Sequence, residues 1–435
     1  MSNNNKSLLQ APGIVLTLAS LLASSAVTAA EIDAELRLGY RVSDNIFREE
    51  LVETEEDIVT GGFSFNLTEQ TRRLSADIRS SFDYLNYKDN TFEEEWVGGV
   101  DARIDITLID ERLIWIFRDN YGQRLPDPLA TPNPGNRENV NFVTTGPNFR
   151  IPFASRSFFG VEGRYSRVDY ENSPFDNDRL SGLVQIGRRM NAAADISLNL
   201  RAERVEFDNA GLSDPYDVQE AFIRYKSKGA RNKVNVDVGY TDVETNANTA
   251  SGYLLRVDWT RTVSRIANFQ LGGGSQYSSE GNIFRLLQSN ARVIGGTSDI
   301  SGDDTPYRSH YFFTRYNLNG ERTRVRFAAS WTSDDYAFVR ALDRDVTTGA
   351  IFIERDITKK FFADVEVKFR KNDYSFFDED YDDLIISAEF GYRYSPALNL
   401  YLGFRNFERS SDVSLGSFSE SRVSVEIAYV PSWGR

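Results

Sequence analysis

The chain has 435 residues, of which 40% are hydrophobic and 13% aromatic, including 30 Phe and 21 Tyr. Its formal net charge of −14 argues against a nucleic-acid partner, because such partners are bound through basic surfaces. The absence of Cys excludes disulfides and thiolate sites, and one His leaves little room for His-based metal sites. The body of the chain holds no run of eighteen apolar residues, which argues against a helical membrane protein.

The N-terminus has the features of a secretory signal. A positive charge at Lys6 precedes a short apolar core over Ile14–Leu22, and small residues then continue to Ala30. The apolar core is too short for a membrane anchor, and no Cys follows it as in a lipoprotein signal. The sequence therefore predicts a cleaved signal peptide over residues 1–30 and a mature chain over residues 31–435, which we treat as one domain.

Alternating apolar and polar residues begin directly after this segment. The first three runs are Ile32–Tyr40, Gly61–Leu67 and Leu74–Phe82. Successive side chains point to opposite faces of a β-strand, so each run predicts a strand with one apolar face.

The clearest run is Trp96–Leu108. Its even positions are apolar or glycine, whereas its odd positions include Asp101, Arg103 and Asp105. Thirteen residues of unbroken alternation exceed a usual globular strand and match the length of a tilted strand that crosses a bilayer. The pattern therefore indicates a transmembrane β-barrel.

The same alternation returns along the rest of the chain. Leu113–Tyr121 is a fifth candidate strand, and fifteen more start near Val140, Phe158, Leu180, Ile196, Val218, Val234, Tyr253, Ala267, His310, Val325, Val346, Phe361, Leu384, Leu400 and Val423. The sequence thus predicts an all-β, antiparallel up-and-down barrel of roughly 18–20 strands, an even number as in single-chain outer-membrane barrels.

The predicted connections alternate in length and charge. Short ones such as Thr68–Arg72 and Thr358–Lys360 carry Arg and Lys, whereas long ones such as Asp44–Asp57, Glu244–Ser251 and Asp373–Asp383 are rich in Asp and Glu. Short periplasmic turns and long extracellular loops are typical of outer-membrane barrels, and a soluble β-sandwich array lacks this asymmetry. The acidic loops are interpreted as solvated surfaces; bridging of surface glycolipid by divalent cations is the alternative.

If the apolar positions face lipid, the intervening charged positions face the lumen. An Arg or Lys side chain on the lipid face destabilises the barrel by roughly 2–4 kcal/mol at the midplane. The many charged side chains of this chain must therefore contact water or one another. The predicted pore-lining residues are Arg79, Asp101, Arg103, Asp105, Arg201, Arg256, Asp258, Arg326, Arg370 and Arg405. Two interpretations stay open, an aqueous pore lined by both signs and ion pairs that brace the wall around a plug.

Two long loops are candidates for narrowing the lumen. Gly122–Arg137 contains four prolines and cannot join a sheet, and Ser278–Pro306 is the longest connection. Either folds inward as a constriction or remains a lid or surface loop. His310 is interpreted as a wall residue, and the sequence predicts no catalytic residue, cofactor or metal site.

Two stretches resemble a known family. Leu36–Phe47, with its Asp-Asn-hydrophobic step, and Pro134–Asn139, followed by Thr145-Gly146-Pro147, resemble outer-membrane β-barrel porins, particularly members encoded with exopolysaccharide production systems. The resemblance implies a barrel fold and polymer passage, and it carries no catalytic residues.

We therefore expect an outer-membrane, porin-like channel of a Gram-negative bacterium that passes exopolysaccharide or other hydrophilic solutes. A plugged barrel that acts as a surface scaffold or adhesin is the alternative, and a barrel enzyme is a weaker one. The expected partners are outer-membrane lipid and lipopolysaccharide, the barrel-insertion machinery, a polysaccharide and a periplasmic export partner.

Overall fold

The computed structural model describes residues 30–127, 130–209, 213–246, 248–279, 304–336, 342–375, 380–412 and 416–431. These residues form twenty strands in one sheet and one short 3₁₀ helix, Pro134–Asn136. The strands are β1 Glu31–Ser43, β2 Glu56–Gln70, β3 Leu74–Tyr87, β4 Glu95–Ile109, β5 Leu113–Arg124, β6 Glu138–Pro152, β7 Ser157–Tyr170, β8 Asn177–Asn191, β9 Ala194–Phe207, β10 Tyr216–Lys228, β11 Asn232–Thr245, β12 Thr249–Thr262, β13 Ala267–Ser278, β14 Tyr307–Asn319, β15 Thr323–Tyr336, β16 Arg344–Asp356, β17 Phe361–Tyr374, β18 Tyr381–Ser395, β19 Leu398–Ser411 and β20 Phe418–Tyr429.

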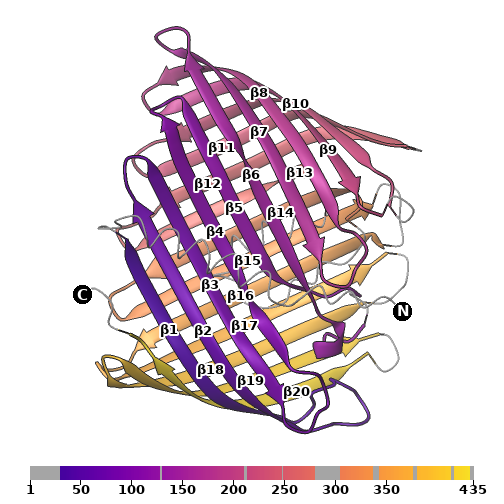
Figure 1. Cartoon of the computed structure of the whole chain (residues 1–435), viewed down its shortest axis with the longest axis vertical. Helices are drawn as coiled ribbons and strands as arrows, with labels where there is room; N and C mark the ends of the chain where they lie inside the picture. The colour runs from indigo at the N-terminus through magenta and orange to yellow at the C-terminus, as the bar shows by residue number, and fades with distance from the viewer. Residues whose placement is uncertain are drawn as a thin grey trace.

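The sheet closes on itself as a barrel. Each strand pairs antiparallel with the next along the chain, and β1 also pairs with β20, from Leu36 opposite Tyr429 to Ser43 opposite Arg422. Figure 1 shows the strands running diagonally around the closed wall. Closure leaves no strand edge unpaired, which is what a sheet needs to span a membrane. The predicted fold class, including the strand count, is confirmed.

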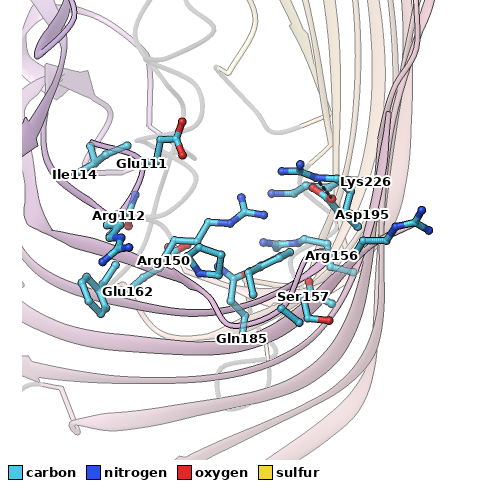
Figure 2. A pocket seen from close by; sticks show the side chains of 18 of the residues that line it. Glu111, Arg112, Ile114, Arg150, Arg156, Ser157, Glu162, Gln185, Asp195 and Lys226 are labelled. Atoms are coloured by element: carbon cyan, nitrogen blue, oxygen red, sulfur yellow. Dashed lines mark ion pairs between the residues drawn. The ribbon is translucent and has the colours of Figure 1, made fainter. Parts of the chain in front are cut away.

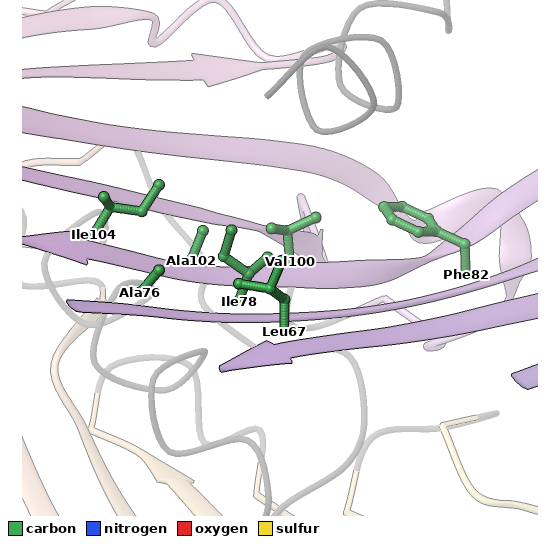
Figure 3. Packing of buried hydrophobic residues seen from close by; sticks show 7 residues of the cluster. All are labelled: Leu67, Ala76, Ile78, Phe82, Val100, Ala102 and Ile104. Carbon is green, nitrogen blue, oxygen red and sulfur yellow. The ribbon is translucent and has the colours of Figure 1, made fainter. Parts of the chain in front are cut away.

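One face of the wall is apolar on every side of the barrel. Leu38 on β1, Leu198 on β9 and Phe404 on β19 belong to this face and are exposed. On β2, β3 and β4 the same face carries an apolar cluster whose side chains are buried, as Figure 3 shows. It consists of Leu67, Ala76, Ile78, Phe82, Val100, Ala102 and Ile104. Because a face that is apolar around a whole circumference suits lipid and not water, this is the outer face of a transmembrane wall.

The two ends of the barrel differ as predicted. At the end that we call the short-turn end, nine connections contain two to four residues; at the opposite, long-loop end, most connections are longer, up to the 28-residue interval between β13 and β14. One prediction was wrong: Glu244–Ser251 is not a long loop, because β11 continues to Thr245 and β12 starts at Thr249.

Most strands extend further toward the long-loop end than alternation suggested. There the polarity of the two faces is reversed, so that Val205 and Tyr216 point inward and are buried whereas Arg204 and Asp217 point outward and pair with each other at 3.3 Å. At this height the outer face extends beyond the lipid, and the inner face is covered by loops. A prediction that relies on outward-facing apolar residues therefore ends each strand too early.

The predicted signal peptide lies outside the described residues, apart from Ala30. In the part of the chain that the structure describes, no helix is both long and apolar enough to span a bilayer.

Candidate functional site

The inner face of the wall is the candidate site, because it collects the charged side chains of the strands. All ten residues predicted from the sequence lie on this face, opposite to the exposed apolar positions. They do not form one centre but are spread around the barrel from β3 to β19. The charged residues therefore form an extended lining around the inside of the barrel and not a single compact site.

The lining near the chain ends is a network of ion pairs that connects β1 with β3 and with β20. Arg37 on β1 bonds Asp83 on β3 at 2.9 Å, and Arg41 joins Asp83 at 3.4 Å to Glu426 on β20 at 2.9 Å. The Arg41–Glu426 pair crosses the seam at which β1 meets β20. They are about one-fifth exposed, so they stand at the boundary between the wall and the open lumen.

Four of the predicted residues lie on β3 and β4, and three of them form one group. Arg79 bonds Asp77 at 2.7 Å and lies 3.7 Å from Asp101, which also accepts from Arg103 at 3.3 Å. Asp105 is held at 2.5 Å by Arg118 on β5. The sequence did not identify Arg118, although its alternation with outward-facing Phe117 gives the required parity.

A second group lies on β9 to β13. Arg224 forms a two-pronged ion pair with Asp237, at 2.7 and 2.8 Å, and Arg256 reaches Glu220 at 2.5 Å. Arg201 bonds Glu203, and Asp258 accepts from Gln270 at 2.6 Å. Paired charges of this kind keep both signs at the lumen surface while fixing their side chains to the wall.

The remaining three predicted residues lie on the far side of the barrel. Arg326 stacks 4.3 Å from the ring centre of Phe352, and Arg370 donates to Asn372 at 3.2 Å. Arg405 stands in register with Ser387 on β18 and with a second arginine, Arg422, on β20. This side of the lining therefore also carries arginines, beside an aromatic ring, an amide and a second arginine.

A repeated arrangement of Phe, Gly and Arg on the inner face was not predicted. Phe362 on β17 lies directly opposite Gly391 on β18, and Arg393 covers its ring at 4.4 Å. A Cβ on Gly391 would lie 2.0 Å from that ring, so the glycine is what allows the ring to lie against the sheet. The same arrangement recurs with Phe313, Gly272 and Arg315 and with Phe158, Gly187 and Arg150. Phe222 and Arg224 also stack opposite Gly239, but a Cβ there would meet the Ala221 carbonyl oxygen at 2.1 Å and not the ring.

Near the long-loop end the inner face becomes apolar and buried. We call this ring of side chains the collar; it comprises Ile58, Tyr87, Val140, Phe142, Val168, Tyr170, Val205, Phe207, Tyr216, Val243, Tyr307, Tyr336, Tyr374, Tyr381, Phe407 and Phe418. Ile58 and Tyr87 pack with the loop residues Ile46 and Phe92, which shows that loops cover the collar from inside. The opening at the long-loop end is therefore narrower than the diameter set by the number of strands.

Polar contacts fix the loop after β1 inside the mouth. Arg48 pairs with Glu420 on β20 at 2.8 Å, and Asn45 donates to the Ser419 carbonyl at 3.0 Å. Burial lowers the pKa of Arg48 to about 9, because desolvation outweighs the attraction of Glu420, so the guanidinium stays charged at neutral pH. The proline-rich loop joins this arrangement, since Asn133 donates to the Phe47 carbonyl at 3.3 Å.

The longest connection is anchored across the lumen. Its first described residue, Ser279, accepts from Arg179 on β8 at 3.0 Å, and Asp304 at its other end forms an ion pair with the same guanidinium. The side chains of Arg179 and Asp304 are 2% and 0% exposed. Both ends of this connection are thus held against β8, several strands away from β13 and β14. Residues 280–303 of this connection lie outside the described residues.

His310 lies on the outward-facing side of β14, in register with Ser275 and Ser333 and 6.3 Å from the ring of Tyr253. This is the wall position predicted for it. Among the described residues, no group of three His, Asp or Glu side chains is arranged to hold a metal ion.

No protein-family model and no curated protein matches the sequence. Solved structures that are similar include the siderophore receptor PirA from Pseudomonas aeruginosa, with 7% identity and a TM-score of 0.42 over 92% of this chain and 80% of that chain. The FrpB iron transporter from Neisseria meningitidis has 8% identity and a TM-score of 0.42 over 92% and 82%. OmpTdeltaL8 of Vibrio cholerae has 8% identity and a TM-score of 0.34 over 93% and 100%. At these values the similarities carry no argument about this chain, and the barrel is established by its own strand register.

Proposed function

We propose that the protein is a channel for hydrophilic solutes in the outer membrane of a Gram-negative bacterium. The observation that carries this proposal is the inner lining of partly exposed charges of both signs, below a narrowed mouth. Charged side chains at the height of the lipid-facing band are stable when they contact water or one another. A wall of twenty strands is too wide for its own side chains to fill, so water is the expected content of the lumen.

The short-turn end is assigned to the periplasm and the long-loop end to the cell exterior. This orientation follows the length asymmetry of the connections, which is general for outer-membrane barrels. It requires translocation by the predicted signal peptide, folding by the barrel-insertion machinery, and contact of the outer face with lipid and lipopolysaccharide.

Exopolysaccharide is the finer assignment of the cargo. It rests on the resemblance of Leu36–Phe47 and Pro134–Asn139 to porins of exopolysaccharide systems, and on a lining that offers arginines beside aromatic rings. Hydroxyl groups of a sugar bond to such arginines and carboxylates, while its apolar faces pack on rings. A periplasmic export partner would deliver such a polymer to the short-turn end.

A second candidate function is a surface scaffold built on a plugged barrel. The anchoring of Ser279 and Asp304 to Arg179 favours it, because the longest connection is fixed within the mouth. Loops held by buried ion pairs also constrict a channel without sealing it, so both candidates share this feature.

Single-channel recording in planar bilayers distinguishes the two. A channel gives discrete conductance steps with purified, folded protein, and liposomes that contain it swell in small neutral sugars. Heat-modifiable migration in gels identifies the folded protein. If folded protein gives neither conductance steps nor swelling, the channel proposal is rejected in favour of the scaffold proposal.

A further inference from the structure

A cavity of about 720 Å³ lies in the inner wall at the short-turn end. Figure 2 shows its side chains projecting from the curved wall into the barrel interior. They come from the turns β4–β5 and β6–β7 and from the adjoining ends of β5 to β10, and include Arg112, Arg156, Arg189, Asp195 and Lys226.

The cavity is cationic in a chain whose net charge is −14. Its lining contains six cationic side chains, Arg112, Arg150, Arg156, Arg189, Arg224 and Lys226, and three carboxylates, Glu111, Glu162 and Asp195. An excess of positive charge within a low-dielectric wall attracts anions more strongly than the same charges in open water.

Some of these cations already have partners. Arg224 is committed to Asp237, and Arg189 lies 3.9 Å from Asp195. Arg112, Arg156 and Lys226 form no ion pair with another described residue. They are therefore the groups with capacity for an external anion.

Arg150 stands on a rigid support. Its guanidinium lies 3.7 Å from the ring centre of Phe158, and that ring lies against Gly187, where a Cβ would approach it to 2.3 Å. Stacking fixes the plane of the guanidinium and leaves its N–H edge for a two-pronged bond to a carboxylate. The cost of ordering this side chain is thus met before a ligand arrives.

The rest of the lining is neutral and mixed. Ile114, Phe149 and Pro152 supply apolar surface, and Gln185 and Ser197 supply hydrogen-bonding groups. Inorganic anions do not use apolar surface, whereas a sugar ring with a carboxylate uses apolar, hydroxyl-binding and cationic groups together.

We infer that this cavity binds a carboxylated saccharide as it meets the short-turn end of the lumen. The inference deepens the proposed channel function and rests on it for the biological role, but binding itself does not require conduction. Arg112, Arg150, Arg156 and Lys226 hold the carboxylates, and the apolar lining packs against the sugar rings.

The test is calorimetric titration of the purified full chain in detergent with trigalacturonate as the probe. The double variant Arg156→Ser with Lys226→Ser should weaken binding by at least about tenfold, since it removes two charge-assisted bonds to the probe. The matched control is Lys359→Ser with Lys360→Ser, which removes the same charge from an exposed turn at the same end, between β16 and β17. This control should bind the probe as the unmodified chain does.

Three outcomes would overturn the inference: no binding of trigalacturonate, equal binding of neutral maltotriose, or equal binding of inorganic sulfate. Equal weakening in both double variants would also overturn it, because the effect would then follow net charge and not the cavity. Conductance measured on the same preparations separates the two proposals. Binding without conductance would contradict the channel proposal and support the binding site. Conductance without binding would support the channel proposal and contradict the binding site.

Discussion

At the scale of single residues, the inner face depends on glycines that the charge pattern did not single out. Gly391 lies opposite Phe362, and any Cβ there would collide with the ring that supports Arg393. Gly349 on β16 has no atom within 4 Å of a built Cβ. Gly349 lies on the outer face, in register with Phe369, whereas Gly391 lies on the inner face under an aromatic ring.

We therefore expect Gly391→Ala to lower the free energy of unfolding by about 1–3 kcal/mol, the usual effect of overpacking, because Phe362 must leave its position. Urea unfolding of the barrel in lipid vesicles measures this. Gly349→Ala is the control and should leave the midpoint unchanged. Equal effects of the two substitutions would mean that the ring packing is not what requires Gly391.

A second prediction at this scale concerns Arg179. Arg179→Ala leaves the buried Asp304 carboxylate without its cation, and breaking a buried pair in this way costs about 3–5 kcal/mol. The loss should appear as release of the longest connection, measured as faster protease cleavage between β13 and β14. If the barrel conducts, its single-channel conductance should also rise.

Arg204→Ala provides the comparison for Arg179, because it removes an exposed outward ion pair with Asp217 on the neighbouring strands. Exposed pairs contribute little to stability, so neither cleavage nor conductance should change. Unaltered cleavage in the Arg179 variant would show that the anchor does not hold this connection in place.

At the scale of one strand, adjacent positions on β19 have opposite surroundings. Phe404 belongs to the outer face and is exposed, whereas Arg405 belongs to the inner face. Phe404→Arg should cost about 2–4 kcal/mol by placing a cation against lipid, so that folding into vesicles is impaired. Heat-modifiable gel migration reports the folded fraction.

Arg405→Ser should fold normally and instead shift the ion selectivity of an open channel toward cations, because a positive charge leaves the lining. Reversal potentials across a salt gradient measure this. A normally folding Phe404→Arg together with a misfolding Arg405→Ser would refute the assignment of the two faces.

At the scale of the whole molecule, the asymmetry of the two ends predicts which surface each connection reaches. An epitope tag between β17 and β18 should be labelled on intact cells, and one in the turn between Ser395 and Leu398 should be labelled only after the outer membrane is opened. The opposite result would mean that the barrel has the opposite orientation in the membrane, with the cationic cavity at the cell exterior.

The alternation of side chains was sufficient to predict the barrel. A bilayer requires outward positions such as Leu38 and Phe404 to be apolar, and it requires every backbone group to be paired, which a closed barrel achieves. The alternation in Trp96–Leu108 is therefore enough to predict a strand of such a wall. The same rule located the charged lining, including Arg79 and Arg256. It failed at Glu244–Ser251, because above the lipid the outer face is polar and the strand loses its signature.

The sequence by itself therefore predicted the barrel, its size of roughly 18–20 strands and the inward face of the charges at the height of the lipid, since all three follow from a period of two and the chemistry of lipid. Only the tertiary structure decided which charges meet. The pairs Arg37–Asp83 and Arg48–Glu420 join residues 46 and 372 positions apart, and the anchor of Asp304 on Arg179 joins residues 125 positions apart. Register, curvature and loop folding bring such residues together, and no local pattern encodes them.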